Sequence, residues 1–231
     1  MQKLGEIVVS LNSKTQTRTK NEDKHDERFS KLASLKDVLH LLMQMLLAET
    51  VDDANVLVIG AGAGPELLYL AEVFPKYRFS VVEPDKNMLD VCVQKCEQYK
   101  ILSRCTFHDG PLQTLAGNKR FDVATSILVS HYLADEATKC AYFADIASRL
   151  LSNGLLIGAD LVTHVALDNV SSLLNVWKRT MDYANAPVPP HVPAISPQEL
   201  RNIVTEGGFE QPIIFYQALL INAWFARKRE N

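Results

Sequence analysis

Three glycines between a buried strand and a helix constrain this chain more than any other feature. Residues 55–59 (NVLVI) form a continuous apolar run, which is typical of a strand buried on both faces of a parallel sheet. Gly60, Gly62 and Gly64 end the run, and Pro65 then fits the first turn of a helix. Without Cβ atoms the loop lets a ligand approach its backbone, and free N–H groups at a helix N-terminus favour electron-rich groups. The sequence therefore predicts a ligand site between this strand and helix.

An acidic residue at the end of the next predicted strand makes the site more specific. Residues 78–83 (RFSVVE) are predicted as the second strand, which places Glu83 nineteen residues after Gly64. At the carboxyl edge of neighbouring strands, such a carboxylate can accept hydrogen bonds from both hydroxyls of a ribose. A dinucleotide fingerprint requires a third glycine where this chain has Pro65, so NAD is disfavoured. We therefore expect an adenosine-type ligand other than a dinucleotide.

The composition excludes several classes of protein. The chain has 231 residues, 47% hydrophobic and 22% charged, which is typical of one globular α/β domain with extra elements. A net charge of −3 indicates no general attraction to nucleic acid or anionic lipid. The most apolar stretch, residues 39–48, is too short for a membrane span, so we expect no membrane partner. Four cysteines and no apolar leader segment lead us to expect reduced thiols and a cytoplasmic location.

Strands alternate with helices along most of the chain, which predicts a doubly wound parallel sheet of the α/β class. The last two predicted strands have almost no connector, so they pair antiparallel or lie apart. We therefore expect a mostly parallel seven-stranded sheet with an antiparallel last strand. The predicted strands cover residues 55–59, 78–83, 104–108, 121–128, 154–160, 211–216 and 218–227, and the predicted helices cover 29–49, 65–74, 87–100, 136–151, 168–183 and 197–206.

Two segments fall outside this alternation. Residues 1–50 are predicted to form a charged arm and lid helices, whereas residues 51–231 form the ligand-binding domain. Within that domain, residues 165–195 are an inserted cap segment with a proline-rich end. The dense mixed charge of the arm is also typical of a solvated surface segment, so that alternative stays open.

Five motifs in a fixed order carry a resemblance to a known family. They are VLVIGAGAG, VVEPDKNML, FHDGPLQTL, FDVATSILVSHYL and LLSNGLLIGADL, followed by an antiparallel pair of strands. Over residues 54–227 this series resembles the class I S-adenosylmethionine-dependent methyltransferases. The resemblance implies a Rossmann-like methyltransferase fold and S-adenosyl-L-methionine as cofactor. It extends to a branch that modifies the cofactor itself, the carboxy-S-adenosylmethionine synthases.

The resemblance assigns the methionine and ribose parts of the cofactor to the loop and Glu83. Gly60, Ala61 and Gly62 would contact the methionine part through their backbone, and Glu83 would hold the ribose hydroxyls. One position departs from the family, because many members carry an acid where this chain has Val58. That acid usually orders the tail or the loop. The groups that we expect to compensate are Asp109, Arg28 or main chain.

Four further residues would surround the adenine. Pro84 and Met88 would form an apolar wall, and Asp109 with the Gly110 amide would read the adenine edge. Two plainer alternatives stay open at this point. Asp-Gly is an ordinary turn pair, and Met88 also fits plain core packing.

The end of the fourth predicted strand leads to the acceptor side. In the resembling family, Ser126 and Ile127 would lie beside the sulfonium and the amino acid tail. His131 and Tyr132 follow where the acceptor pocket opens, and His131 is a candidate general base because histidine accepts protons near neutral pH. Asp160, at the end of the fifth predicted strand, is a second catalytic candidate. A satisfied polar group is the alternative for His131.

Aromatic residues of the inserted segment are candidates for the acceptor pocket. Trp177 and Tyr183 would wall it together with Tyr132, or they would simply cover the core. Cys92 and Cys96 face one way on a helix, but no matching pair completes a tetrahedral zinc site. We therefore expect these thiols to pack in the core, and no metal.

The expected function is transfer of the sulfonium methyl group to an O, N or C nucleophile of an unidentified acceptor. The charge balance favours a small molecule over nucleic acid, although Lys178, Arg179 and the arm could form a basic patch. The alternatives are a non-catalytic methyltransferase-like binding module, a carboxy-S-adenosylmethionine synthase-like enzyme and an NAD-dependent oxidoreductase. The sequence leaves a homodimer open.

Overall fold

The centre of the protein is a sheet of seven strands: β1 (Asn55–Ile59), β2 (Arg78–Glu83), β3 (Cys105–Asp109), β4 (Phe121–Ile127), β5 (Leu150–Leu161), β6 (Ile213–Ala218) and β7 (Ile221–Arg227). The computed structural model describes residues 33–162, 172, 175–176, 179 and 195–230. The strands follow the order β3-β2-β1-β4-β5-β7-β6. β7 runs antiparallel to β5 and β6, and β1 to β5 pair in parallel.

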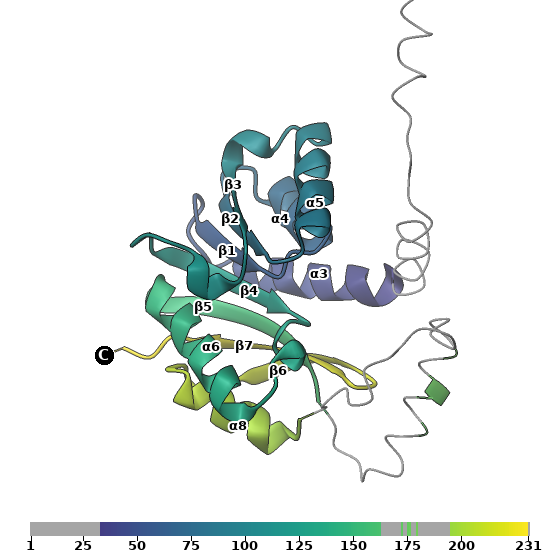
Figure 1. The fold of residues 1–231 in the computed structure, drawn as a ribbon, viewed down its shortest axis with the longest axis vertical. Helices are drawn as coiled ribbons and strands as arrows, with labels where there is room; N and C mark the ends of the chain where they lie inside the picture. The colour runs from purple at the N-terminus through teal and green to yellow at the C-terminus, as the bar shows by residue number, and fades with distance from the viewer. Residues whose placement is uncertain (1–32, 163–171, 173–174, 177–178, 180–194, 231) are drawn as a thin grey trace, which may run out of the picture.

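Helices cover both faces of this sheet (Figure 1). α3 (Ala33–Leu47), α4 (Pro65–Val73) and α5 (Lys86–Gln98) pack on one face, and α6 (Glu136–Arg149) and α8 (Pro197–Glu206) pack on the other. Each face has its own cluster of buried apolar side chains. The middle strands β1 and β4 are therefore covered on both sides, which explains why residues 56–59 of β1 are a continuous apolar run.

This architecture confirms the predicted fold class, a doubly wound and mostly parallel seven-stranded sheet. The last strand in the chain, β7, is antiparallel as expected, and it inserts between β5 and β6. From β1 the sheet grows through β2 and β3 in one direction and through β4 and β5 in the other. In open α/β sheets a ligand site forms at the carboxyl ends of the strands at such a switch point.

The start of β5 and the turn between β6 and β7 differ from the prediction. β5 begins at Leu150, four residues before Gly154, because a register shift against β4 accommodates the intervening residues. The helix predicted over residues 136–151 therefore ends at Arg149, and Leu150 and Leu151 belong to this strand. The turn between β6 and β7 falls at Leu219 and Leu220, where Leu219 has a φ of 54°. Leucine is not a residue that marks turns, so the sequence pattern carried no signal there.

α3 contributes directly to the core of the domain. Leu39, Met43 and Leu47 recur every four residues and are buried beside α4 and the sheet. The predicted helix over residues 29–49 therefore exists from Ala33, and its start lies outside the described residues. Within the described ranges, no helix is long and apolar enough to cross a membrane. The role of the N-terminal residues 1–50 as an arm and lid stays a prediction.

Arg104 links the end of α4 to the start of β3. The pattern predicts it as a strand residue, but it ends the 3-10 helix η1 (Leu102–Arg104). Its guanidinium donates hydrogen bonds to the carbonyl oxygens of Ala71 at 2.7 Å, Phe74 at 3.0 Å and Tyr77 at 3.2 Å. Carbonyl groups at a helix C-terminus lack partners within the helix, and a cation there also favours the helix dipole.

We expect Arg104→Ala to lower the free energy of unfolding by about 2 kcal/mol, because three carbonyl groups lose a charged donor. Urea unfolding followed by circular dichroism measures the change. Arg120→Ala is the matched control, since Arg120 is exposed and its guanidinium bonds to Asn118, two residues away. Equal losses of stability in the two variants would contradict the bridging role of Arg104.

Candidate functional site

The predicted cofactor residues meet along the carboxyl edge of the sheet. Ile59, the last residue of β1, pairs in register with Val82 of β2 and with Ser126 of β4. Glu83 ends β2 and pairs with Asp109, which ends β3. The glycine loop leaves β1 at the same edge, so residues far apart in the sequence come together where the fold predicts a ligand.

The glycine loop requires glycine at each of its three positions. Gly60, Gly62 and Gly64 have φ values of 67°, 53° and 82°, which other residues rarely adopt. A Cβ atom on Gly60 would lie 2.5 Å from Cγ2 of Val129, and one on Gly64 would lie 2.7 Å from Sγ of Cys92. A Cβ atom on Gly62 would meet nothing within 4 Å. The loop is thus held close to the protein at both ends, and its middle faces open space.

Glu83 is locked to the loop by two backbone hydrogen bonds. Its Oε2 accepts from the Gly62 N–H at 2.7 Å, and its Oε1 accepts from the Asp85 N–H at 2.8 Å. The residue is only 7% exposed. An ionised carboxylate has about four acceptor sites, so two remain for further donors. Glu83 therefore has a fixed orientation and spare acceptor capacity at the carboxyl edge.

Beside Glu83, the start of α5 presents a partly apolar surface. The Asp85 side chain caps this helix by accepting from the N–H groups of Asn87 and Met88. Pro84 is exposed, and Met88 is half-buried, whereas the next residue, Leu89, is in the core. Met88 lies outside both core clusters, so core packing alone does not account for it. The adenine wall predicted from Pro84 and Met88 stays a prediction.

Asp109 and Gly110 are placed differently from the expectation in one respect. Asp109 ends β3 and is half-exposed, with its Oδ2 at 3.8 Å from the Lys86 Nζ. The Gly110 N–H donates a hydrogen bond to the Glu83 carbonyl oxygen at 3.2 Å. The Gly110 amide is thus engaged with the backbone, and the Asp109 carboxylate is the group of this pair that faces the edge.

The end of β4 carries Ser126 and Ile127. Ser126 is buried, and its Oγ forms a hydrogen bond of 2.8 Å with the hydroxyl of Tyr142 on α6. Ile127 is half-buried and packs against the α3–α4–α5 core cluster. The Ser126 hydroxyl therefore fastens β4 to α6, and Ile127 is the better placed of the two to contact a ligand at the edge.

His131 lies in the 3-10 helix η3 (Ser130–Tyr132), directly after β4. Its ring packs against Tyr132 with 4.0 Å between ring centroids, and the Tyr132 side chain is 79% exposed. Burial, with a smaller effect from Lys139, lowers the pKa of His131 to about 4. Its Nδ1 is buried and has no hydrogen-bond partner among the described residues. His131 is neutral at pH 7 and weakly basic, which makes it a poor general base in this conformation.

Asp160 ties three elements together below the site. Its Oδ1 accepts a hydrogen bond from the Ser130 hydroxyl of η3, and its Oδ2 accepts one from the Trp224 Nε1 of β7 at 3.0 Å. The residue is 2% exposed, and burial raises the pKa of its carboxyl group. Because both oxygens are engaged, the geometry favours a structural role for Asp160 over the predicted catalytic one.

The remaining predictions concern the three aromatic residues assigned to the acceptor pocket and the two cysteines assigned to the core. Trp177 and Tyr183 lie outside the described residues, whereas Tyr132 stands at the carboxyl edge in η3. Cys92 and Cys96 are free and buried in the core cluster. In the described part of the chain, no group of His, Cys, Asp and Glu side chains could hold a metal ion.

Residues 56–154, which carry the loop, Glu83 and β4, match the family model described as a methyltransferase domain. Over these residues the chain is similar to the methyltransferase domains of that family, and its fold is that of a class I S-adenosylmethionine-dependent methyltransferase. This match supports S-adenosylmethionine as the predicted cofactor and gives no support to the dinucleotide alternative. No curated protein matches the sequence.

The fold of this chain is similar to that of solved structures. A possible exported protein from Bordetella parapertussis is 18% identical with a TM-score of 0.66, and the match covers 83% of this chain and 67% of that one. A SAM-dependent methyltransferase from Methanosarcina mazei is 13% identical with a TM-score of 0.62, and the match covers 81% of this chain and 98% of that one. A candidate sarcosine dimethylglycine methyltransferase from Galdieria sulphuraria is 12% identical with a TM-score of 0.62, and the match covers 84% of this chain and 85% of that one. At these identities the likeness shows the fold.

Two observed features of the carboxyl edge are compatible with S-adenosylmethionine. The open space over Gly62 leaves room against the loop backbone, and Glu83 keeps two acceptor sites for hydroxyl groups. Sequence reasoning missed one buried residue beside the loop, Glu66, whose carboxyl group lies in the first turn of α4. A first-turn glutamate is common in helices, so only its burial distinguishes it.

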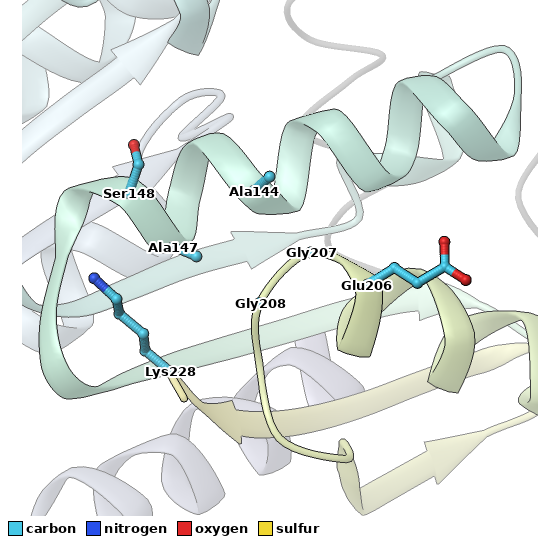
Figure 2. Close-up of a pocket in the computed structure, with 7 residues that line it drawn as sticks. All are labelled: Ala144, Ala147, Ser148, Glu206, Gly207, Gly208 and Lys228. Carbon is cyan, nitrogen blue, oxygen red and sulfur yellow. The ribbon is translucent and has the colours of Figure 1, made fainter. Parts of the chain in front are cut away.

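A surface pocket of about 260 Å³ lies elsewhere, at the opposite edge of the sheet (Figure 2). The Lys228 Nζ donates to the carbonyl oxygen of Leu150, the first residue of β5, at 2.9 Å. Glu206 accepts from the Cys140 Sγ at 3.4 Å, and Figure 2 shows it on the other side of the pocket from Lys228. Both charges are engaged with the protein, and the pocket is separate from the cofactor edge. It is lined by Ala144, Ala147, Ser148, Glu206, Gly207, Gly208 and Lys228.

Proposed function

We propose that this chain transfers the methyl group of S-adenosylmethionine to a small-molecule acceptor, with the cofactor held at the carboxyl edge of β1, β2 and β4. The observation that carries the proposal is the junction of Gly62 and Glu83. A carboxylate with spare acceptor sites is fixed 2.7 Å from the backbone of a loop whose middle faces open space. This arrangement suits a ribose whose hydroxyl groups donate to the remaining acceptor sites of Glu83 beside the loop.

Each residue at the edge has a defined task in this proposal. Glu83 accepts hydrogen bonds from the ribose hydroxyls, and Pro84 and Met88 pack against the adenine. Asp109 accepts from the adenine edge, while the loop backbone and Ile127 align the methionine part. The cofactor supplies a methyl group activated by a sulfonium, which leaves as a neutral thioether. The chain therefore needs mainly to align the two reactants and exclude water.

A general base is not required by this chemistry unless the acceptor must lose a proton before attack. His131 has a low pKa and Asp160 is fully engaged, so neither is placed as a strong base. We infer that the acceptor attacks as a neutral or already ionised nucleophile. Tyr132 and the predicted Trp177 and Tyr183 are the candidates to contact it.

The small-molecule acceptor is supported by the net charge of −3, which gives no general attraction to nucleic acid. Among the similar structures, the description of the Galdieria protein names two small amines, sarcosine and dimethylglycine. A cytoplasmic location and a homodimer stay predictions.

Calorimetric titration with S-adenosylmethionine, S-adenosylhomocysteine and NAD tests the proposed function. We expect the first two to bind in the micromolar range and NAD not to bind. A screen of amines, phenols and carboxylic acids for S-adenosylhomocysteine release then identifies the acceptor class. Binding without turnover of any acceptor would favour the non-catalytic binding module. Absence of binding to either sulfur compound would overturn the proposal.

A further inference from the structure

Glu66 is a buried carboxyl group with no task in the site described above. It stands in the first turn of α4, two residues after Gly64, and is 9% exposed. Its Oε1 is buried and has no hydrogen-bond partner among the described residues. A first-turn glutamate gains from the helix dipole without leaving water, and glutamate is almost never buried unless it is paired.

The polar group that acts on Glu66 is the hydroxyl of Thr125. Thr125 of β4 is fully buried, and its Oγ1 makes no regular hydrogen bond in the described part of the chain. Burial raises the pKa of Glu66 to about 7, although the nearby Thr125 hydroxyl acts in the opposite direction. Thr125 pairs in register with Val58, two residues before Gly60. The two polar groups therefore lie where the first turn of α4 covers the sheet, close to the glycine loop.

A buried carboxyl group and a buried hydroxyl group without partners both cost free energy. Such groups in a native structure point to a partner that arrives from outside, such as a ligand. In the proposed function, the group that approaches this loop is the methionyl tail of S-adenosylmethionine, which carries an α-ammonium group. An ammonium group brings three N–H donors and a positive charge, which is what a carboxylate and a hydroxyl lack here.

We propose that the Glu66 carboxylate, with the Thr125 hydroxyl beside it, binds the α-ammonium group of the methionyl tail. The inference rests on the proposed function and adds a binding residue to it. It also bears on the groups expected to compensate for Val58. Asp109 ends β3, which β2 separates from the loop strand, and it lies near Lys86. Arg28 lies outside the described residues.

The proposal predicts a pH dependence with a definite sign. In the described part of the chain, no charged group of α3, α4, β1 or β4 shifts the pKa of Glu66, which responds to burial and to Thr125. Below pH 7 the carboxyl group of the free protein is protonated, so binding of a cation must release that proton. Affinity for the tail therefore falls by up to about tenfold for each pH unit below 7.

The stability of the free protein depends on pH in the opposite direction to the affinity for the tail. A pKa raised from 4.5 to about 7 stabilises the fold at low pH, and this contribution is lost as the pH rises through 7. Glu66→Gln removes the ionisable group, so the variant is expected to be at least as stable as the wild type at pH 8. If the Glu66 carboxylate instead stabilised the fold through contacts within the protein, Glu66→Gln would be less stable than the wild type at pH 8.

The test compares two ligands that differ in the amino acid tail. S-adenosylhomocysteine has the α-ammonium group, and 5′-methylthioadenosine lacks the whole tail. We expect Glu66→Gln to weaken binding of S-adenosylhomocysteine by about 10- to 100-fold at pH 8 and to leave binding of 5′-methylthioadenosine unchanged. Glu72→Gln is the matched control, because Glu72 is exposed on the same helix. Titration in two buffers of different ionisation enthalpy at pH 6.5 measures the released proton.

The outcomes separate this inference from the proposed function. Wild-type affinity of Glu66→Gln for S-adenosylhomocysteine would overturn the role of Glu66 and leave the proposed function in place. An equal loss for both ligands would also overturn it, because the substitution would then act through the loop. If the wild-type protein bound no sulfur compound, the proposed function would fail and this inference with it. A folded variant is verified by its thermal unfolding at each pH.

Discussion

Glu83→Ala is expected to weaken binding of S-adenosylmethionine by about 3 kcal/mol, or roughly 100-fold in Kd. The variant loses the acceptor proposed for the ribose hydroxyls. It also releases the Gly62 N–H at 2.7 Å and the Asp85 N–H at 2.8 Å, which hold the loop and the start of α5. Calorimetric titration of the wild type and the variant measures the loss.

Two further variants make the Glu83 experiment specific. Glu83→Gln keeps a carbonyl oxygen for one of the backbone donors, so an intermediate loss of affinity is expected. Glu97→Ala removes an exposed acid from α5 and should bind like the wild type. Unchanged affinity of Glu83→Ala would remove Glu83 from the binding site and would leave its two backbone hydrogen bonds as a structural feature alone.

Gly158→Ala is expected to lower the free energy of unfolding by about 3 kcal/mol. Gly158 of β5 pairs in register with Trp224 of β7. A Cβ atom on Gly158 would lie 2.4 Å from Cζ2 and 2.6 Å from Cε2 of the Trp224 ring. Trp224 is completely buried and donates to Asp160, so the ring has no free direction in which to move. Urea unfolding followed by circular dichroism measures the change.

A double-mutant cycle identifies the cause of that loss. Trp224→Leu removes the ring that the new methyl group would meet, although it also creates a cavity and leaves Asp160 with one donor fewer. We expect Gly158→Ala to cost much less in the Trp224→Leu background than in the wild type, because the clash is then absent. Equal costs in both backgrounds would show that the ring is not what requires glycine at position 158.

The cofactor edge could be predicted well from the sequence, because its parts are local. The apolar run of β1, the glycines after it and the acid that ends β2 each reveal their role through neighbouring residues. Parallel strands then bring their carboxyl ends to one edge, which places Glu83 beside Gly62 without any further information. The acceptor side could not be predicted as well, since His131 and Asp160 depend on which atoms surround them.

The sequence by itself determined the fold class, the order of strands and helices, and the loop with its acidic partner, because periodicity and glycine positions act within a few residues. Only the tertiary structure decided that Glu66 is buried beside Thr125 without a partner, that Asp160 is engaged by Ser130 and Trp224, and that Leu219 turns a hairpin. Burial and hydrogen bonding depend on residues that are distant in the chain. Their pairing follows from how the strands and helices pack.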